Sequence, residues 1–371
     1  MNVSELEKIK KILTKTGHVF EYQVCDKFEK AGWMIIPNKF YLDKDEEKGR
    51  EIDLIAYQIS EVRDQTAVVT VIIVESKQST KNKWVFFTKG EFLGSVNIDN
   101  YPLFYLNEID EFDKYVSRDM LLNELKKNNL NMIFDFDHKA YCYSAVVEDR
   151  NESRGKSNYR PVNPTDIYGA IFPVIKALTS ELEFYKNRKI ARNEKRFYWM
   201  IPLVVYNGEM LEARIRDGKI DLERKEEFQY ITRYRSKYYD DFYSVNIINW
   251  NLIDKYVAYY KSIHECMVGL ISKNIKRFYS EIDTKTFELI WDNIIEHLHT
   301  YLYFSGFTRM NFYPSFYNPA REELEIVIND PAIYKTTIDN PQYYKGKIEK
   351  VISDILNRSI EVVFINVPIP H

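Results

Sequence analysis

The feature that most constrains this chain is one apolar segment that ends in two charged residues. Residues 68–77 read Val-Val-Thr-Val-Ile-Ile-Val-Glu-Ser-Lys, and six of the first seven are apolar. Such a run is typical of a strand that is buried on both faces of a sheet. Residues two apart leave a strand on the same side, so Glu75 and Lys77 should lie together at its end. Because charges are costly to desolvate, we expect a metal ion and a phosphate to bind there.

Two further acidic residues precede this strand. Asp53 lies inside the short apolar run at 52–56, which reads as a second strand, and Glu21 lies near the start of a probable helix. The order of these residues, with Glu21 on a helix, Asp53 on a strand, and Glu75 and Lys77 on the next strand, resembles the PD-(D/E)XK nuclease superfamily. That is the fold of many restriction endonucleases. The resemblance covers roughly the first third of the chain.

The match departs from the family pattern at two points. Ile52 stands where the family name has a proline, and the polar stretch Ser60–Gln65 lengthens the connection between the two strands. A Glu-x-Lys tripeptide alone is common and usually marks the solvated end of a strand. The nuclease interpretation therefore depends on the combination with Asp53 and Glu21.

The resemblance implies a catalytic group of four side chains. Asp53, Glu75 and the backbone carbonyl of Ser76 would hold Mg²⁺, which prefers oxygen ligands, and Mn²⁺ can substitute for it. Lys77 would orient the attacking water and offset charge in the transition state. Glu21 would orient the water, the lysine or a second metal. Whether burial or the neighbouring anions determine the pKa of Lys77 is left open by the sequence.

Contacts with DNA must come from local patches, because the chain has a net charge of −3. Arg188, Lys189 and Arg192 belong to one basic segment that could follow a phosphate backbone, although basic runs are more often solvated surfaces. Gln78 follows the catalytic lysine and could touch the DNA backbone, although it points to the opposite face of its strand.

Composition indicates an ordinary globular protein. The 371 residues are 45% hydrophobic and 29% charged, and only three are cysteines. An odd number of widely spaced cysteines fits a reducing compartment and neither a disulfide framework nor a thiolate zinc site. The N-terminus lacks the pattern of a signal peptide, and no apolar stretch reaches the length of a membrane span. We therefore expect a cytoplasmic protein that does not contact a membrane.

The expected fold class is α/β, with a restriction-endonuclease-like mixed sheet flanked by helices and an appended α+β C-terminal region. We expect a nuclease-like core at 1–150 and a second region at 151–371, which could pack on the same sheet. Residues 153–164 are the linker candidate, and Asn207-Gly208 predicts a hairpin. Periodicity predicts helices at about 16–32, 166–185 and 252–279, and strands at about 33–41, 52–59, 67–77, 83–87, 131–147 and 197–206.

These observations predict a Mg²⁺-dependent endodeoxyribonuclease of a restriction or phage-defence type. Its partner is DNA, and a homodimer is the default expectation, because cutting both strands of a duplex usually takes two active sites. Residues 151–371 would then serve DNA contact, dimerisation or regulation. Two alternatives stay open. One is a nuclease of the same fold that acts on RNA or on a particular nucleic-acid structure, and the other is a catalytically inactive member that binds nucleic acid or protein.

Overall fold

The computed structural model divides into two compact units. The first comprises Met1–Glu108 and Arg118–Leu270, and the second comprises Ile109–Ser117 and Ile271–His371. The structure describes residues 3–14, 16–63, 66–89, 103–109, 116–130, 139–151, 156–188, 194–281, 287, 291, 294–295, 312–318, 320–328, 334–335, 339, 341–356 and 359–365.

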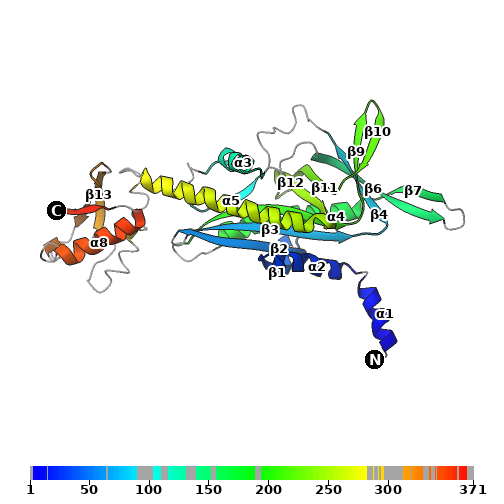
Figure 1. Cartoon of the computed structure of the whole chain (residues 1–371), viewed down its shortest axis with the longest axis horizontal. Helices are drawn as coiled ribbons and strands as arrows, with labels where there is room; N and C mark the ends of the chain where they lie inside the picture. The colour runs from blue at the N-terminus through cyan, green and yellow to red at the C-terminus, as the bar shows by residue number, and fades with distance from the viewer. Residues whose placement is uncertain are drawn as a thin grey trace. The chain divides into compact units, whose positions relative to one another are not determined.

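The first unit is built around one large mixed sheet (Figure 1). Its main path has the order β1-β2-β3-β8-β12-β11-β6-β4-β9-β10, while β5 pairs with β8 and β7 pairs with β6. The strands are β1 (Met34–Asp43), β2 (Lys48–Arg63), β3 (Thr66–Gln78), β4 (Asn82–Thr88), β5 (Phe104–Asn107), β6 (Lys139–Asn151), β7 (Lys156–Val162), β8 (Lys195–Asn207), β9 (Met210–Arg216), β10 (Lys219–Arg224), β11 (Glu227–Arg235) and β12 (Asp240–Asn249).

Five α-helices and a short 3₁₀ segment are described in or entering this unit. They are α1 (Val3–Leu13), α2 (Gly17–Lys30), α3 (Arg118–Lys127), α4 (Thr165–Asn187), the 3₁₀ segment η5 (Trp250–Leu252) and α5 (Ile253–Ser280). The α/β class with a mixed sheet flanked by helices is thus confirmed. None of the helices among the described residues is both long enough and apolar enough to cross a membrane.

The strand β3 lies inside the sheet, as its apolar sequence predicts. It pairs antiparallel with β2 and parallel with β8, and it is buried from Thr66 to Ser76. Val71 and Ile73 belong to the core that α4 shares, whereas the Thr70 hydroxyl bonds to His264 of α5. Helices therefore cover β3 on both faces, which explains why the run is continuously apolar rather than alternating.

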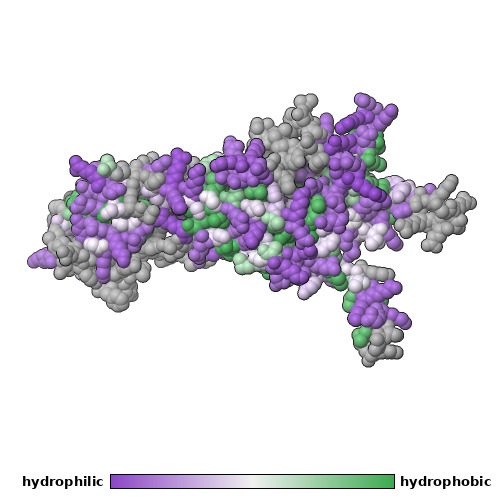
Figure 2. Space-filling view, viewed as in Figure 1, coloured by the Kyte–Doolittle hydropathy of each residue, from purple (hydrophilic) through white to green (hydrophobic). Residues whose placement is uncertain are grey.

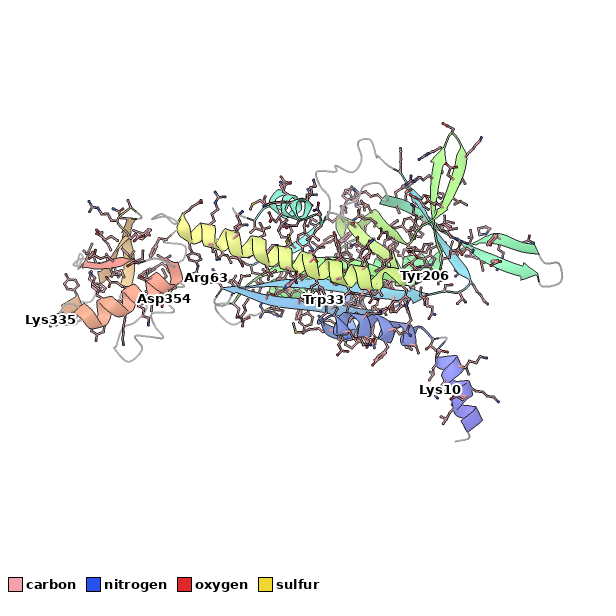
Figure 3. The ribbon with its side chains drawn as sticks, viewed as in Figure 1. Lys10, Trp33, Arg63, Tyr206, Lys335 and Asp354 are labelled. Carbon is pink, nitrogen blue, oxygen red and sulfur yellow. The ribbon has the colours of Figure 1, made fainter. Side chains whose placement is uncertain are left out.

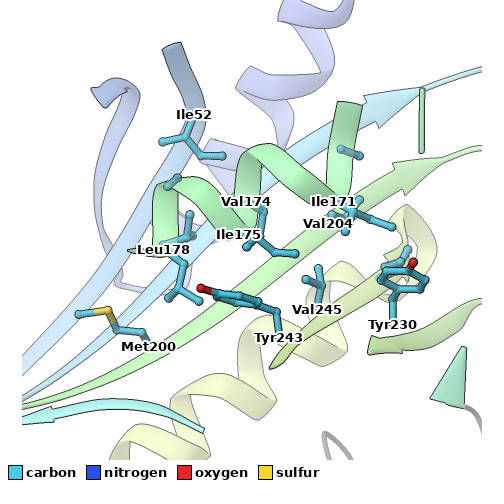
Figure 4. Close-up of a cluster of buried hydrophobic side chains, with 14 of the residues drawn as sticks. Ile52, Ile171, Val174, Ile175, Leu178, Met200, Val204, Tyr230, Tyr243 and Val245 are labelled. Atoms are coloured by element: carbon cyan, nitrogen blue, oxygen red, sulfur yellow. The ribbon is translucent and has the colours of Figure 1, made fainter. Parts of the chain in front are cut away.

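The helix α4 forms the centre of the largest hydrophobic cluster (Figure 4). Its buried positions include Ile171, Val174, Ile175 and Leu178, which recur at helical spacing. They pack against β3, β8, β11 and β12, strands that come from both sides of residue 150. This cluster joins the two halves of the sequence into one core.

The division of the chain differs from the one expected at residue 150. Because β8 pairs with β3 along its whole length, from Thr66 with Lys195 to Gln78 with Asn207, sequence before and after residue 150 shares one sheet. The linker prediction at 153–164 is wrong for residues 156–162, because β7 pairs antiparallel with β6 there. The division instead falls near Leu270, within α5.

The hairpin prediction at Asn207-Gly208 is also wrong. Beyond Gly208 the chain does not fold back on β8, whose neighbours are β3, β5 and β12, and β9 pairs instead with β4 and β10. The glycine has a different cause. A Cβ at Gly208 would lie 2.4 Å from the Tyr206 ring. The close approach of the Tyr206 side chain therefore requires glycine, which has no Cβ, at position 208.

The second unit contains a smaller sheet of order β13-β14-β15. Its described elements are β13 (Phe312–Asn318), β14 (Glu323–Ile328), α8 (Pro341–Leu356) and β15 (Glu361–Ile365). The strand β15 forms at the C-terminal apolar run, and its parallel partner β14 alternates between buried and half-buried positions. The described elements of this unit thus combine helix and strand over a shorter stretch than the α+β region expected at 151–371.

Candidate active site

The pairing of β2 with β3 ends immediately before the two candidate carboxylates. Leu54 and Val74 form the last pair, so Asp53 and Glu75 occupy the next facing positions. There the Ser76 N–H donates to Asp53 Oδ2 at 2.7 Å, and the Ser76 hydroxyl donates to the same oxygen at 2.9 Å. Asp53 Oδ2 thus accepts the hydrogen bond that a backbone carbonyl of β2 would otherwise accept from the Ser76 N–H. This fixes the Asp53 carboxylate where the two strands stop pairing.

The Lys77 ammonium group lies against the Glu75 carboxylate. Lys77 Nζ is 2.5 Å from Glu75 Oε1, and their side chains are 33% and 7% exposed. The contact agrees with strand alternation, since residues two apart share a side. The structure therefore brings Asp53, Glu75 and Lys77 together at one end of adjacent strands.

The environment of Glu75 disfavours its charged form. Burial is the main cause that raises the pKa of Glu75 to about 8, with the Asp53 charge acting in the same direction and Lys77 against it. The second carboxylate oxygen of Glu75, Oε2, is buried and has no hydrogen-bond partner. A buried acceptor without a partner is costly, so this oxygen favours the arrival of a proton or a cation.

The pKa values of Asp53 and Lys77 shift for related reasons. Burial raises the pKa of Asp53, although the hydrogen bonds from Ser76 and the charge of Lys77 oppose the shift. Desolvation alone would lower the pKa of Lys77, but the charge and hydrogen bond of Glu75, with a further contribution from Asp53, outweigh it and raise the pKa. Lys77 is therefore a permanent cation near neutral pH, which suits charge stabilisation rather than proton uptake.

Glu21 lies on α2 within electrostatic reach of this group. Its side chain is 21% exposed, and its charge raises the pKa of both Asp53 and Glu75. The helix buries Phe20, Val24 and other residues of one stripe, which leaves Glu21 beside the buried face. This agrees with the position expected from the helical periodicity.

One residue near the site was not foreseen from the sequence. The Nδ1 atom of His18 lies 2.9 Å from Glu21 Oε2, and this hydrogen bond is the main cause that raises the pKa of His18. The His18 side chain is 85% exposed, so its other ring nitrogen is accessible to solvent. The signal was present in the sequence, because residues three apart are neighbours on a helix.

The residues fit a hard divalent cation that keeps part of its water shell. Asp53 and Glu75 offer carboxylate oxygens, and the buried Oε2 of Glu75 lacks a partner. The Ser76 carbonyl points toward β2, like the Ser76 N–H, because both groups of a strand residue share a side. No group of three or more His, Cys, Asp and Glu in the described part of the chain could hold a metal ion. Water molecules and the Ser76 carbonyl would therefore have to complete the coordination, and Mg²⁺ typically keeps several water ligands in protein sites.

The site lies at one identifiable end of the sheet. Lys77 pairs with Tyr206 of β8, whose hydroxyl donates to the Asn82 carbonyl at 2.6 Å and whose ring stacks on Trp84. Figure 3 labels Tyr206 near the end from which the β9–β10 and β6–β7 hairpins project, and Arg63 at the opposite end of β2. The stacked rings anchor the turn that follows β3.

Of the two predicted DNA-contact residues that the structure describes, one lies at this end and the other does not. Gln78 is exposed at the end of β3, close to the site. Arg188 follows the last residue of α4, whose first turn bonds to β4 through Asp166 and Asn82. A helix of 23 residues spans about 33 Å, so Arg188 is far from the site. Lys189 and Arg192 lie outside the described residues.

Comparison with known proteins adds no relative. No protein-family model matches the chain, and neither a curated protein nor a solved structure is significantly similar to it.

Proposed function

We propose that this protein is a Mg²⁺-dependent endodeoxyribonuclease with a restriction-endonuclease-like core, of the PD-(D/E)XK type, that serves restriction or phage defence. The observation that carries the proposal is the meeting of Asp53, Glu75 and Lys77 where the β2–β3 pairing ends. Clusters of titratable groups with displaced pKa values are typical of active sites. The Glu75 pKa of about 8 and its unpaired buried oxygen fit a site that is complete only when a cation is bound.

The carboxylates and the lysine have separate tasks in this proposal. Asp53, Glu75 and the Ser76 carbonyl would hold the ion, which supplies polarisation of the scissile phosphate and acidification of a bound water. The Ser76 N–H and hydroxyl fix the Asp53 carboxylate, so its orientation is set before any ligand arrives. Lys77 presents a stable positive charge to the phosphate oxygens, where negative charge grows in the transition state.

Glu21 would act at the periphery of the site. Its carboxylate is accessible enough to meet a water molecule and close enough to influence Asp53 and Glu75. The hydrogen bond to His18 restrains the Glu21 side chain near the start of α2. Together they would orient the attacking water relative to the phosphate.

Cleavage of supercoiled plasmid tests the proposed function. The wild-type protein should nick or linearise the plasmid with Mg²⁺ or Mn²⁺ and should be inactive with a chelator. Asp53→Asn keeps the side-chain shape and removes the charge, so we expect a cleavage rate lower by on the order of 10²–10³. Substrates of duplex DNA, single-stranded DNA and RNA of one sequence show which nucleic acid is cut.

Two results would reject the proposal. One is cleavage that persists with the chelator and in Asp53→Asn. The other is a well-folded protein that cuts none of the substrates with either cation. If the protein preferentially cuts RNA, the proposed active site stands and the proposed DNA substrate is wrong.

A further inference from the structure

The strand β10 is an exposed edge of the large sheet. It stands last in the strand order, and β9 is its only partner among the described strands. All six of its residues are exposed. An exposed edge presents unpaired backbone groups that can pair with another strand, and proteins normally protect such edges.

The turn of this hairpin determines which backbone groups face outward. Arg216 and Lys219 close a two-residue loop, Asp217-Gly218, in which both φ angles are positive, at 50° and 73°. In such a hairpin the closing pair is hydrogen-bonded. Lys219 and every second residue after it therefore bond to β9. The N–H and C=O groups of Ile220, Leu222 and Arg224 point to the open edge.

The side chains of the hairpin form a charged face and an apolar face. Ile215, Ile220 and Leu222 lie on one face and are 57%, 59% and 61% exposed. Lys219, Asp221 and Glu223 point to the opposite face, because side chains alternate along a strand. In Figure 2 hydrophobic and hydrophilic side chains lie next to each other on this projection. Apolar side chains this exposed on an edge strand favour association.

The sequence of β10 is complementary to its own antiparallel copy. With a twofold axis at Asp221, Lys219 faces Glu223 of the second copy, and Glu223 faces its Lys219. Ile220 faces Leu222 of the second copy in the same arrangement, and these are the residues whose backbone groups point outward. The register thus satisfies hydrogen bonds, charge and apolar contact together.

The neighbouring registers match less well. Moving the axis to Leu222 places Asp221 opposite Glu223 of the second copy, which sets like charges against each other. Moving it to Ile220 places Leu222 opposite Gly218 and Glu223 opposite Asp217. The axis at Asp221 has one unfavourable feature, the two facing Asp221 carboxylates. Arg214, which pairs with Asp221 inside each hairpin, partly compensates for it.

We propose that two copies of this chain associate through β10, in the register centred on Asp221, to form a continuous sheet across the dimer. This goes beyond the proposed nuclease activity and does not depend on it. In the described part of the monomer, Glu223 forms an ion pair with Lys225 at 3.1 Å, and the Glu223 side chain is 66% exposed, so this contact contributes little. Glu223 can therefore turn to the second copy at small cost.

Charge reversal at the two facing positions tests the dimer without nucleic acid. We expect sedimentation equilibrium to show a wild-type dimer, and Lys219→Glu or Glu223→Lys alone to weaken it about tenfold, because each change creates two repulsive pairs. The double variant Lys219→Glu/Glu223→Lys restores both pairs and should recover wild-type affinity. A mixture of the two single variants should form a heterodimer. Asp221→Asn should tighten the dimer.

The matched control is Arg160→Glu on β7, an exposed edge strand of the neighbouring hairpin. It makes the same change in net charge as Lys219→Glu and should leave association unaltered. Melting curves check that each exposed substitution leaves the fold intact. A wild-type monomer at about 100 µM would overturn the proposal. So would single variants that dimerise normally, or a double variant that fails to recover. Absence of nuclease activity would leave this result untouched, so the two proposals can fail separately.

Discussion

At the scale of single residues, the contact between Lys77 and the buried Glu75 sets the electrostatics of the candidate site. Alternation of side chains along β3 predicts this contact. The sequence could not give the direction of the Lys77 pKa shift, because burial and the surrounding anions act in opposite directions. The structure resolves this balance in favour of the anions. The hydrogen bonds from Ser76 to Asp53 were also beyond sequence reasoning, since they depend on where the two strands stop pairing.

The raised pKa of Glu75 predicts a pH-dependent stability. Unfolded, this carboxyl group titrates near 4.5, whereas in the fold it keeps its proton up to about pH 8. The folded state therefore binds more protons at Glu75 in this window, so the contribution of this group to stability falls as pH rises from about 5 to 8. We expect Glu75→Gln to remove this pH-dependent loss. Between about pH 5 and 8 the free energy of unfolding of wild type should therefore fall by up to a few kcal/mol relative to that of the variant.

Urea denaturation of both proteins at pH 5, 7 and 9 without divalent cations measures the difference. Mg²⁺ should restore wild-type stability mainly at high pH, where the proton no longer competes for the carboxylate. If the free energy of unfolding of wild type and of Glu75→Gln changes with pH in parallel, then Glu75 is ionised throughout this range and its pKa is not raised by the fold.

At the scale of elements, apolar periodicity predicted β3, α2, α4 and α5 close to their observed bounds. These elements can be predicted from local sequence, because each carries its own periodic apolar stripe or continuous apolar run. The partner of a strand is not a local property. Asn207-Gly208 resembles a hairpin turn, yet β9 pairs with β4, which precedes it by more than a hundred residues, as well as with β10. Local turn chemistry could not reveal that the chain leaves β8 there.

A buried polar contact links α5 to β2 and β3. His264 is 4% exposed, and its ring nitrogens lie 2.9 Å from the hydroxyl groups of Ser60 and Thr70. Burial lowers the pKa of His264, so the neutral ring serves this contact. His264→Ala leaves two hydroxyl groups without their partner and a cavity, so we expect a loss of about 2–4 kcal/mol in the free energy of unfolding.

A double-mutant cycle with Thr70→Val checks this explanation by urea denaturation. Thr70→Val should cost less in the His264→Ala background than in wild type, because the partner is already gone, with a coupling of about 1 kcal/mol. Strictly additive losses would mean that the hydrogen bond contributes nothing and that α5 docks through apolar contacts alone.

At the scale of the whole molecule, the α/β class and the order of the site residues could be predicted, but the division of the chain could not. The glycine, proline and basic residues at 153–164 resembled a linker, whereas residues 156–162 form β7, which pairs with β6 in the same sheet. Parallel pairing of β3 with β8 joins residues far apart in sequence, and only the assembled core around α4 reveals it. The same pairing continues past the candidate site, to Gln78 and Asn207, so the region after residue 150 builds part of its support.

The proposed function requires that the charged end of β3 performs catalysis rather than merely ending a strand. Lys77→Ala and Lys39→Ala form a matched pair of variants for testing it. Lys39 is 24% exposed and pairs with Glu181, itself 4% exposed, at 2.7 Å, which closely resembles the pair of Lys77 with Glu75. Both variants lose a half-buried lysine from an ion pair in the same sheet, so stability effects should be comparable.

The most direct measurement is the initial rate of Mg²⁺-dependent plasmid cleavage by wild type and both variants. DNA affinity in Ca²⁺ and melting temperature are measured in parallel. We expect Lys77→Ala to lower the rate by on the order of 10²–10³ with DNA affinity nearly unchanged, and Lys39→Ala to cleave like wild type. If Lys77→Ala melts normally and cleaves as fast as Lys39→Ala, the proposed active site is wrong.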